Sequence, residues 1–381
     1  MKKSLIALAF GTLGLGIAEF IMMGILPDVA ADLGISIPTA GHLVSAYAIG
    51  VCVGAPLLVL ARRCQLKHIL LVLAGIIITG NLCAALSRSY GMLLAARFIS
   101  GLPHGAYFGV GSIVADKLAD RGKSSQAVSI MVAGMTIANL FGVPLGTALS
   151  SQISWRLPFL LGGLLGVAIL YFIWRWVPQV EKLPDTGFRG QFRFLRTPAP
   201  WLLLGATMLG NGGVFCWYSY VSPMLTQVSG FAPSSLTFLM VLAGFGMVAG
   251  NLTGGRLADR YTPGRVAAVL QGMLALVLTG IFFGAAIPWL AVLLMCLCTF
   301  GLFGVSSPQQ LLLIRYSKGG ELLGAASVQV AFNLGNALGA FCGGLPLAAG
   351  LDYRYPALLG APFALLGFFL LFVFVRKYEN K

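Results

Sequence analysis

Residues 1–27 read MKKSLIALAFGTLGLGIAEFIMMGILP, a stretch that has two incompatible interpretations. Two lysines, an apolar run and the small residues Gly16 and Ala18 are typical of a secretory signal cut after Ala18, which would make Glu19 the first residue of the mature chain. Alternatively, the stretch is a retained membrane-spanning helix with the Glu19 carboxylate inside it. The apolar run continues past Ala18 to about 23 residues, which is long for a signal peptide and long enough to span a bilayer. We therefore predict a retained helix.

An internal repeat also favours the retained helix. Removal of residues 1–18 would delete most of a helix whose counterpart at 200–225 is present. The repeat predicts two parallel six-helix bundles, a plan found in many secondary transporters. These bundles are expected at 1–177 and 200–381, joined by a polar, basic cytoplasmic linker at 178–199. Four residues of the first half recur at a constant spacing in the second half: Gly14, Gly16, Pro27 and Gly34 correspond to Gly210, Gly212, Pro223 and Gly230.

The composition lies outside the range of ordinary soluble domains. Of 381 residues, 58% are hydrophobic and 9% are charged, and 50 are glycine. Apolar stretches of the length that a spanning helix needs, about 20 residues, recur along the chain. We predict an all-α membrane protein with twelve transmembrane helices in two six-helix pseudo-repeats and both termini in the cytoplasm. The spans are expected at about 4–27, 41–61, 69–87, 91–115, 126–149, 157–177, 200–225, 235–257, 265–285, 288–314, 323–349 and 355–375.

The formal net charge of +14 reports membrane topology in this chain. With a cytoplasmic N-terminus and twelve spans, the Lys and Arg residues fall on the cytoplasmic side, apart from Arg88, Arg97, Arg156 and Arg354. That asymmetry follows the positive-inside rule, and no nucleic-acid partner is expected.

The sequence gives no sign of an enzyme, a cofactor or a metal site. The seven cysteines lie mostly inside predicted spans and form no pair or cluster at metal-ligand spacing. A nucleophile elbow, a phosphate-binding loop and paired carboxylates within one span are all absent from the sequence.

One carboxylate is placed deep in a predicted span. Among 11 Asp and Glu residues, only Glu19 lies about 12 Å from the outer end of its helix. Arg97 in the fourth span lies at a similar depth, about 9 Å in. Burial disfavours an ionised carboxylate and a nearby arginine favours it, so a near balance lets the group load and release a proton. We predict Glu19 as proton carrier and Arg97 as its modulating partner; the alternative is a permanent ion pair that only orders the first bundle.

Uncharged polar and aromatic residues in the spans form a predicted substrate cavity. Of the three histidines only His104 lies mid-span, where it either joins a proton relay or is a hydrogen-bonded core residue. Amides inside a membrane either join helices or bind a neutral polar solute such as a polyol. The predicted cavity residues are His104, Asn139, Asn211, Trp217, Tyr218, Gln329 and Asn333. For Trp217, stacking on a sugar or an aromatic drug and simple packing remain open alternatives.

A charged loop follows the eighth span. Residues 254–265 read GGRLADRYTPGR, which places Asp259, Arg260 and Arg265 in a compact network at the cytoplasmic surface. This stretch resembles the loop signature of the major facilitator superfamily, in which the acid and its arginines form a cytoplasmic gate. The corresponding stretch of the first half, GAPLLVLARRCQLKH at 54–68, has two arginines where the second half has Asp259 and Arg260, so it lacks the gate acid.

Two further stretches resemble motifs of superfamily antiporters. The fourth span, LLAARFISGLPHGAYFGVG, resembles the arginine motif linked to proton transfer, with a snorkelling Arg97 as the alternative. GMTIANLFGVPLG in the fifth span resembles the antiporter motif, although Val143 separates Gly142 from Pro144; the alternative is a plain packing seam.

Over nearly its whole length, from about Lys3 to Arg376, the chain resembles the arabinose-efflux type of drug and sugar proton antiporters, in stretches such as AEFIMMGILPDVA and GGELLGAASVQVAFNLGNALGA. The resemblance implies a monomeric, multi-pass protein of the bacterial inner membrane. Its partners would be protons, the lipid bilayer and a small polar solute, a sugar such as arabinose or a drug, which it exports by alternating access. A facilitator of sugars or nucleosides without proton coupling, and a receptor or scaffold without transport, remain alternatives.

Overall fold

The computed structural model of the chain describes residues 2–35 and 37–379. These residues contain helices and no strand, so the predicted all-α fold is confirmed. Eleven of the described helical segments are long and apolar enough to cross a membrane. The predicted fourth span corresponds to α4 (Tyr90–Lys117), a 28-residue helix outside those eleven that carries Arg97 and His104.

The chain divides into two compact units. Unit 1 comprises Met1–Phe194 and Ser317–Val330, and unit 2 comprises Leu195–Tyr316 and Ala331–Lys381. Most of the predicted linker at 178–199 therefore belongs to unit 1. Helix α15 (Glu321–Ala348) contributes its first turns to unit 1 and its remainder to unit 2.

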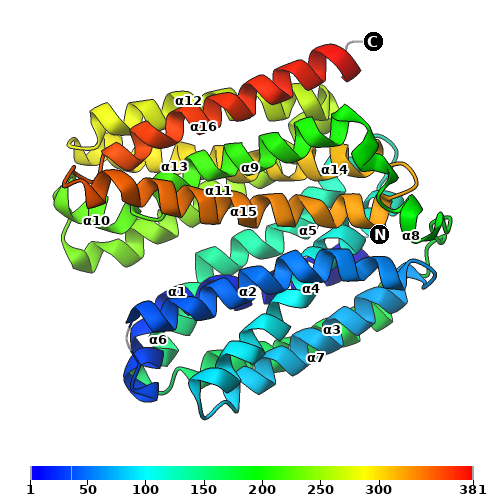
Figure 1. Cartoon of the computed structure of the whole chain (residues 1–381), viewed down its shortest axis with the longest axis horizontal. Coiled ribbons are helices and arrows are strands. Elements are labelled where there is room, and N and C mark those ends of the chain that lie inside the picture. The colour runs from blue at the N-terminus through cyan, green and yellow to red at the C-terminus, as the bar shows by residue number, and fades with distance from the viewer. Residues whose placement is uncertain (1, 36, 380–381) are drawn as a thin grey trace. The chain divides into compact units, whose positions relative to one another are not determined.

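Unit 1 is built from long helices joined by short loops, which can be followed by colour in Figure 1. One of its spans changes helix type in the middle, because the π-helical turn η2 separates α5 from α6. The elements before the linker are α1 (Lys2–Leu33), α2 (Ile37–Leu57), η1 (Leu58–Ala61), α3 (Leu66–Ala85), α4, α5 (Ser124–Ile137), η2 (Ala138–Gly142), α6 (Val143–Gln152) and α7 (Arg156–Trp176). The linker itself forms α8 (Gly187–Gly190) and η3 (Arg193–Arg196).

Unit 2 has the same kind of architecture. Several of its helices begin with proline at the first or second position, where the missing N–H would have no intrahelical partner in any case. Besides the C-terminal part of α15, its elements are α9 (Pro198–Tyr218), α10 (Val221–Gln227), η4 (Pro233–Ser235), α11 (Leu236–Arg260), α12 (Pro263–Gly284), α13 (Pro288–Gly304), α14 (Ser306–Tyr316), α16 (Tyr355–Phe374) and η5 (Val375–Glu379).

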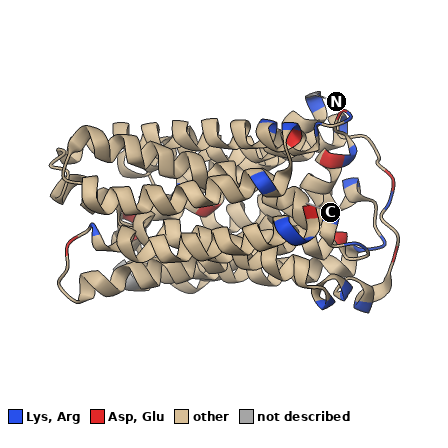
Figure 2. Cartoon of the chain, turned by 90° about the horizontal axis from the view of Figure 1, so that it is seen from above, with Lys and Arg blue, Asp and Glu red and all other residues tan. Residues whose placement is uncertain are grey.

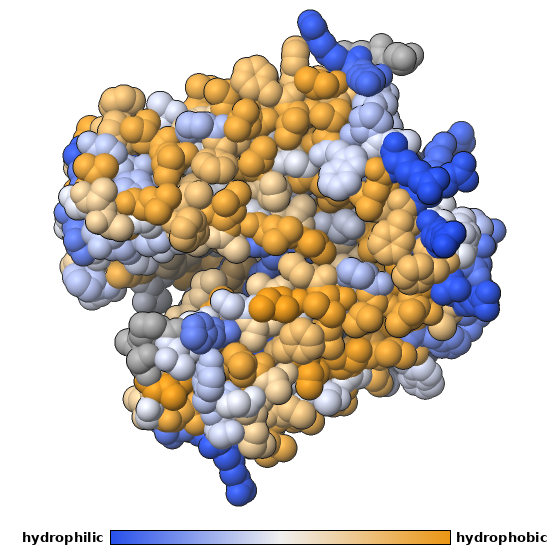
Figure 3. Space-filling view, in the orientation of Figure 1, coloured by the Kyte–Doolittle hydropathy of each residue, from blue (hydrophilic) through white to orange (hydrophobic). Residues whose placement is uncertain are grey.

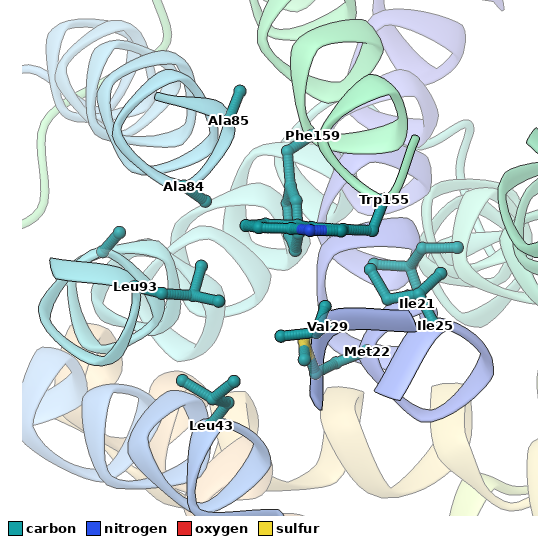
Figure 4. Close-up of a cluster of buried hydrophobic side chains, with 11 residues drawn as sticks. Ile21, Met22, Ile25, Val29, Leu43, Ala84, Ala85, Leu93, Trp155 and Phe159 are labelled. Carbon is teal, nitrogen blue, oxygen red and sulfur yellow. The ribbon is translucent and has the colours of Figure 1, made fainter. Parts of the chain in front are cut away.

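The opening stretch of the sequence lies within α1, which runs without interruption from Lys2 to Leu33 although Pro27 lies inside it. One face of α1 packs into an apolar cluster of unit 1, to which α2, α3, α4 and α7 also contribute. Figure 4 shows the Trp155 and Phe159 rings between these helices. The cluster consists of Ile21, Met22, Ile25, Val29, Leu43, Ala84, Ala85, Leu93, Ala96, Trp155 and Phe159, and we call it the apolar plug.

Glycines four residues apart create close helix crossings in both units. A Cβ atom built on Gly50 or Gly54 of α2 would lie 2.3 or 1.9 Å from a backbone carbonyl oxygen of α4. The same arrangement recurs between α11 and α13, where a Cβ on Gly250 or Gly254 would lie 2.0 or 2.1 Å from a carbonyl oxygen. Only glycine allows backbones to approach so closely. The internal repeat of the sequence therefore extends to the packing of these helix pairs.

The surface of the helices is suited to lipid. Large apolar side chains are exposed along them, including Leu86, Val269, Leu276, Phe283 and Trp289. Figure 3 shows these apolar stretches, with hydrophilic residues toward the helix ends. In each unit, Lys and Arg residues gather at one end of the helices (Figure 2). An apolar belt with charged ends is what a bilayer requires of a spanning bundle.

Candidate functional site

The structure brings Glu19 and His104 together inside unit 1. Glu19 of α1 is 7% exposed, and His104 of α4 is fully buried. The Oε2 atom of Glu19 lies 3.8 Å from Nε2 of His104. On the other side of the imidazole ring, Nδ1 lies 2.8 Å from the hydroxyl oxygen of Tyr47 on α2. The Tyr47 hydroxyl also lies within 3.4 Å of the Leu15 carbonyl oxygen on α1, so the hydrogen of this hydroxyl has two acceptors.

Arg97 lies in the same place and is fully buried. Its Nη1 donates to the carbonyl oxygen of Ala18 at 2.6 Å, and its Nε donates to that of Leu43 at 3.4 Å. The guanidinium carbon lies 4.6 Å from the centre of the Tyr47 ring and 5.9 Å from that of Phe159 in the apolar plug. Backbone carbonyls and aromatic faces therefore hold the cation. One of these carbonyls belongs to Ala18, the residue before Glu19.

We call Glu19, Tyr47, Arg97 and His104 the buried polar cluster. Three of its atoms have no hydrogen-bond partner among the described residues: Oε2 of Glu19, Nη2 of Arg97 and Nε2 of His104. Buried polar atoms are usually paired, and exceptions call for an explanation in strain or function. A proton, a water molecule or a polar group of a substrate would supply the missing partners. The cluster therefore has the chemistry of a binding or proton-transfer site.

Gln329, another predicted cavity residue, is buried in the part of α15 that belongs to unit 1 and lies beside His104. Asn139 lies on the π-helical turn η2, half-buried, and its amide donates to the Met135 carbonyl of its own helix at 3.0 Å. Gly142 and Pro144 of the predicted antiporter motif flank the junction of η2 and α6, where the helix changes type.

The remaining predicted cavity residues belong to unit 2. The amide of Asn211 on α9 donates to the Thr207 carbonyl at 2.8 Å. Trp217 is fully buried, and its indole N–H points to Sδ of Met224 at 3.0 Å. Tyr218 is half-buried and packs edge-on against Phe215.

Asn333, the last of the predicted cavity residues, is buried on the unit 2 part of α15. The helices that carry Asn333 and Asn211 approach closely, because a Cβ on Gly335 of α15 would lie 2.3 Å from the Met208 carbonyl oxygen on α9. The two asparagines therefore belong to helices that pack through their backbones, and the amide of Asn211 is committed to its own helix.

The predicted gate residues of the second half lie at the α11–α12 loop. Asp259 and Arg260 are in the last turn of α11, half-buried and exposed respectively, and Arg265 is exposed at the start of α12. The Arg260 guanidinium lies 5.6 Å from the Tyr261 ring centre. The Thr262 hydroxyl accepts from the Arg265 backbone N–H at 3.4 Å and caps α12.

Glu379, in the C-terminal turn η5, also binds this loop. Its carboxylate accepts from the Thr262 hydroxyl at 2.9 Å and from the Gly264 backbone N–H at 2.9 Å. An anion is favourable here because the N-terminus of α12 presents unsatisfied N–H groups. The sequence reading missed this contact, because Glu379 is more than a hundred residues from the loop.

The α2–α3 loop obtains a carboxylate from the linker. Oδ1 of Asp185 accepts from Nε of Arg62 at 3.1 Å, and Oδ2 accepts from Nε of Arg63 at 2.7 Å. The Arg63 hydrogen bond, together with one from the Gly187 backbone N–H, holds the pKa of Asp185 below its usual range. The sequence analysis did not identify Asp185 or Tyr47 as site residues. For Asp185, the available signal was an acid in the linker together with two arginines in the loop. For Tyr47, it was a tyrosine within a predicted span.

Comparison with known proteins places the chain in a family. The model of the Major Facilitator Superfamily matches residues 8–328. A curated relative, "Putative transporter AraJ" of Escherichia coli (strain K12), is 50% identical over 97% of this chain and 93% of its own length. "Inner membrane transport protein YdhP" of the same strain is 37% identical over 98% and 96%. "Probable sugar efflux transporter" of Helicobacter pylori (strain P12) is 25% identical over 99% and 95%.

The fold agrees with these matches. The crystal structure of the Escherichia coli fucose:proton symporter FucP superimposes with a TM-score of 0.78 at 15% identity, over 97% of this chain and 98% of that one. The protein is thus a multi-pass transporter of the bacterial inner membrane and not an enzyme. Its sequence, its helical fold and its relatives agree that the chain belongs to the Major Facilitator Superfamily.

Proposed function

We propose that the protein is a proton-coupled exporter of a small polar solute that works by alternating access, with Glu19 as the proton carrier. The observation that carries the proposal is the geometry of Glu19. It is a carboxylate buried within a spanning helix, and its Oε2 has no hydrogen-bond partner among the described residues. An ionisable group inside a membrane protein is costly and commonly marks an ion or proton pathway.

Arg97 suits the role of modulating partner. Its N–H groups donate to the carbonyls of Ala18 and Leu43. Among the described residues, Arg97 and Glu19 form no direct ion pair with each other. The cation therefore favours the ionised carboxylate through space, without a hydrogen bond that would have to break at each protonation. This geometry supports a carrier over a permanent Glu19–Arg97 ion pair.

His104 is placed to bond either form of Glu19 once its Nε2 approaches Oε2 from the present 3.8 Å, and Tyr47 sets which tautomer it presents. If the Tyr47 hydroxyl donates to Nδ1 of His104, the ring presents an Nε2–H donor to the ionised carboxylate. If the hydroxyl donates to the Leu15 carbonyl instead, Nδ1–H donates to Tyr47, and Nε2 can accept from the protonated carboxyl or from the neighbouring Gln329 amide. A neutral histidine can thus change its tautomer to match the protonation state of Glu19.

Tyr47→Phe is therefore expected to slow proton-coupled transport without abolishing it. Loss of one buried hydrogen bond, about 1–3 kcal/mol, corresponds to about a 5- to 150-fold lower rate. The rate would be measured in proteoliposomes as a function of pH, and the profile should change shape because the tautomer of His104 is no longer controlled. Tyr107→Phe is the matched control, since this fully buried tyrosine of α4 bonds the Leu8 carbonyl of α1. Equal behaviour of the two variants would refute the role of Tyr47.

The proposed solute is neutral and polar, such as a pentose. Each unit carries buried amides, Gln329 beside His104 in unit 1 and Asn333 in unit 2, and amides both donate and accept hydrogen bonds as sugar hydroxyls require. Asn211 of unit 2 already donates one N–H to the Thr207 carbonyl, which leaves its amide oxygen as the group to offer a solute. The printed name of the Helicobacter pylori relative, a probable sugar efflux transporter, points to the same class of solute.

Purified protein in proteoliposomes tests this function. Solutes found by a thermal-shift screen of pentoses, thiogalactosides, nucleosides and cationic drugs would be offered outside vesicles with an acidic lumen. Uphill accumulation that a protonophore abolishes is the expected result. Downhill exchange that persists unchanged without the gradient would replace antiport with facilitation, and no flux of any of these solutes would favour a receptor or scaffold.

A further inference from the structure

The α2–α3 loop of unit 1 has no acidic residue of its own. It reads Leu-Ala-Arg-Arg where the α11–α12 loop reads Leu-Ala-Asp-Arg, so Arg62 occupies the position of Asp259 in the repeat. Two adjacent arginines repel each other, and without a carboxylate they cannot form a compact charge network. A carboxylate that balances them has to come from outside the loop.

We propose that Asp185 of the linker supplies the acid that this loop lacks, so that the linker is a working part of the gate and not a passive tether. Asp185 bonds Arg62 and Arg63 at the same time, one through each carboxylate oxygen. The orientation of its carboxylate is also held, because the Gly187 N–H donates to Oδ1 at 3.0 Å. The inference rests on the alternating-access cycle proposed above but not on its coupling to protons.

The linker is anchored a second time, directly after Asp185. The Thr186 hydroxyl donates to the Gly319 carbonyl in the turn before α15, and the buried Gln191 amide donates to the same oxygen at 3.3 Å. Contact here is tight, since a Cβ on Gly320 would lie 2.4 Å from the Gln191 carbonyl oxygen.

Residues 185–191 therefore form a strap from the α2–α3 loop to the turn at 317–320, all within unit 1. Any movement that separates this loop from this turn must break the bonds of Asp185 or those of Thr186 and Gln191. In the second half Asp259 belongs to the loop itself, and the remote carboxylate that reaches this loop, Glu379 of η5, bonds Thr262 and Gly264.

Hydrogen–deuterium exchange of the full-length protein in nanodiscs tests the strap. In Asp185→Asn, exchange over 183–192 and 58–65 is expected to be about 2- to 30-fold faster, the range for loss of two surface ion pairs. Glu181→Gln is the matched control, because this second linker carboxylate makes no hydrogen bond or ion pair with a described residue. The double variant Arg62→Gln with Arg63→Gln removes the same two ion pairs by changing the loop, and it should give the same exchange pattern. Exchange equal to that of Glu181→Gln in both variants overturns the proposal.

A second readout separates a gate from a merely structural contact. In a background without the seven native cysteines, Gln329→Cys reports access to the buried polar cluster. A membrane-impermeant maleimide, added on the linker side, should label this position faster in Asp185→Asn. Arg62→Asp combined with Asp185→Asn restores the order Leu-Ala-Asp-Arg and should return labelling toward the original rate. Unchanged labelling in Asp185→Asn, or absence of rescue in the double variant, overturns the gate role, whether or not transport proves to be proton-coupled.

Discussion

Glu19→Gln is expected to abolish the solute gradient that the protein can build. A transporter that exchanges one proton for a neutral solute gains about 2.3 kcal/mol from a membrane potential of about 100 mV, which supports about a 50-fold concentration ratio. Glutamine has the shape of the protonated side chain but cannot release a proton. The ratio should therefore fall to about one, while exchange of solute down its gradient continues. Labelled solute and a pH-sensitive dye, followed in the same proteoliposomes, measure both fluxes.

The control for this variant is another carboxylate of the same helix. Asp28→Asn removes a charge from α1, but Asp28 accepts a hydrogen bond from Ser150 and lies more than two helical turns beyond Glu19 along α1. It should retain solute-driven proton movement. If Glu19→Gln moved protons as the original protein does, Glu19 would have no part in coupling, and the proposed mechanism would be wrong.

The membrane spans were predictable because they depend on local composition. Apolar stretches of bilayer length and the internal repeat located the helices, including α1, whose charged start and apolar run imitate a signal peptide and which continues six residues beyond the predicted end at 27. The place where the chain departs from a regular α-helix, the π-turn η2, was not predicted. Gly142 and Pro144 were noticed there, but only the packed structure determines how the backbone accommodates them.

Residues of the candidate site were predictable only where one residue was chemically unusual by itself. Glu19 and Arg97 are rare charges inside apolar stretches, and their similar depths already suggested that they lie close together. In the structure both belong to the buried polar cluster. Tyr47 escaped notice because a tyrosine in a span is ordinary until a histidine is found 2.8 Å away. Asp185 escaped notice because its partners are more than a hundred residues away in the chain.

Arg97→Met is expected to lower the free energy of unfolding by about 3–5 kcal/mol, the cost of removing one member of a buried charged group. Methionine fills a similar volume between the Tyr47 and Phe159 rings, so the effect reports the lost charge and the lost bonds to Ala18 and Leu43 more than a cavity. Unfolding in mixed micelles of increasing SDS content measures the change. Arg354→Met, which removes a partly exposed cation paired with Asp352, should cost no more than about 1 kcal/mol.

The double variant Arg97→Met with Glu19→Gln shows whether the arginine acts on Glu19. If its charge stabilises the ionised carboxylate through space, Arg97→Met should cost less once Glu19 is neutral, with an interaction energy of about 1–3 kcal/mol. In the original protein, protonation of Glu19 removes that same interaction and leaves the cation of Arg97 without a counter-charge in the buried polar cluster. The coupling measured in the cycle is then the stabilisation that this conformation loses on proton loading, and it sets an upper bound on how far protonation can shift the transporter toward a conformation that lacks the interaction. Additive effects of the two substitutions would mean that Arg97 only anchors α1 and α2 through their carbonyls, and proton release would need another source of charge.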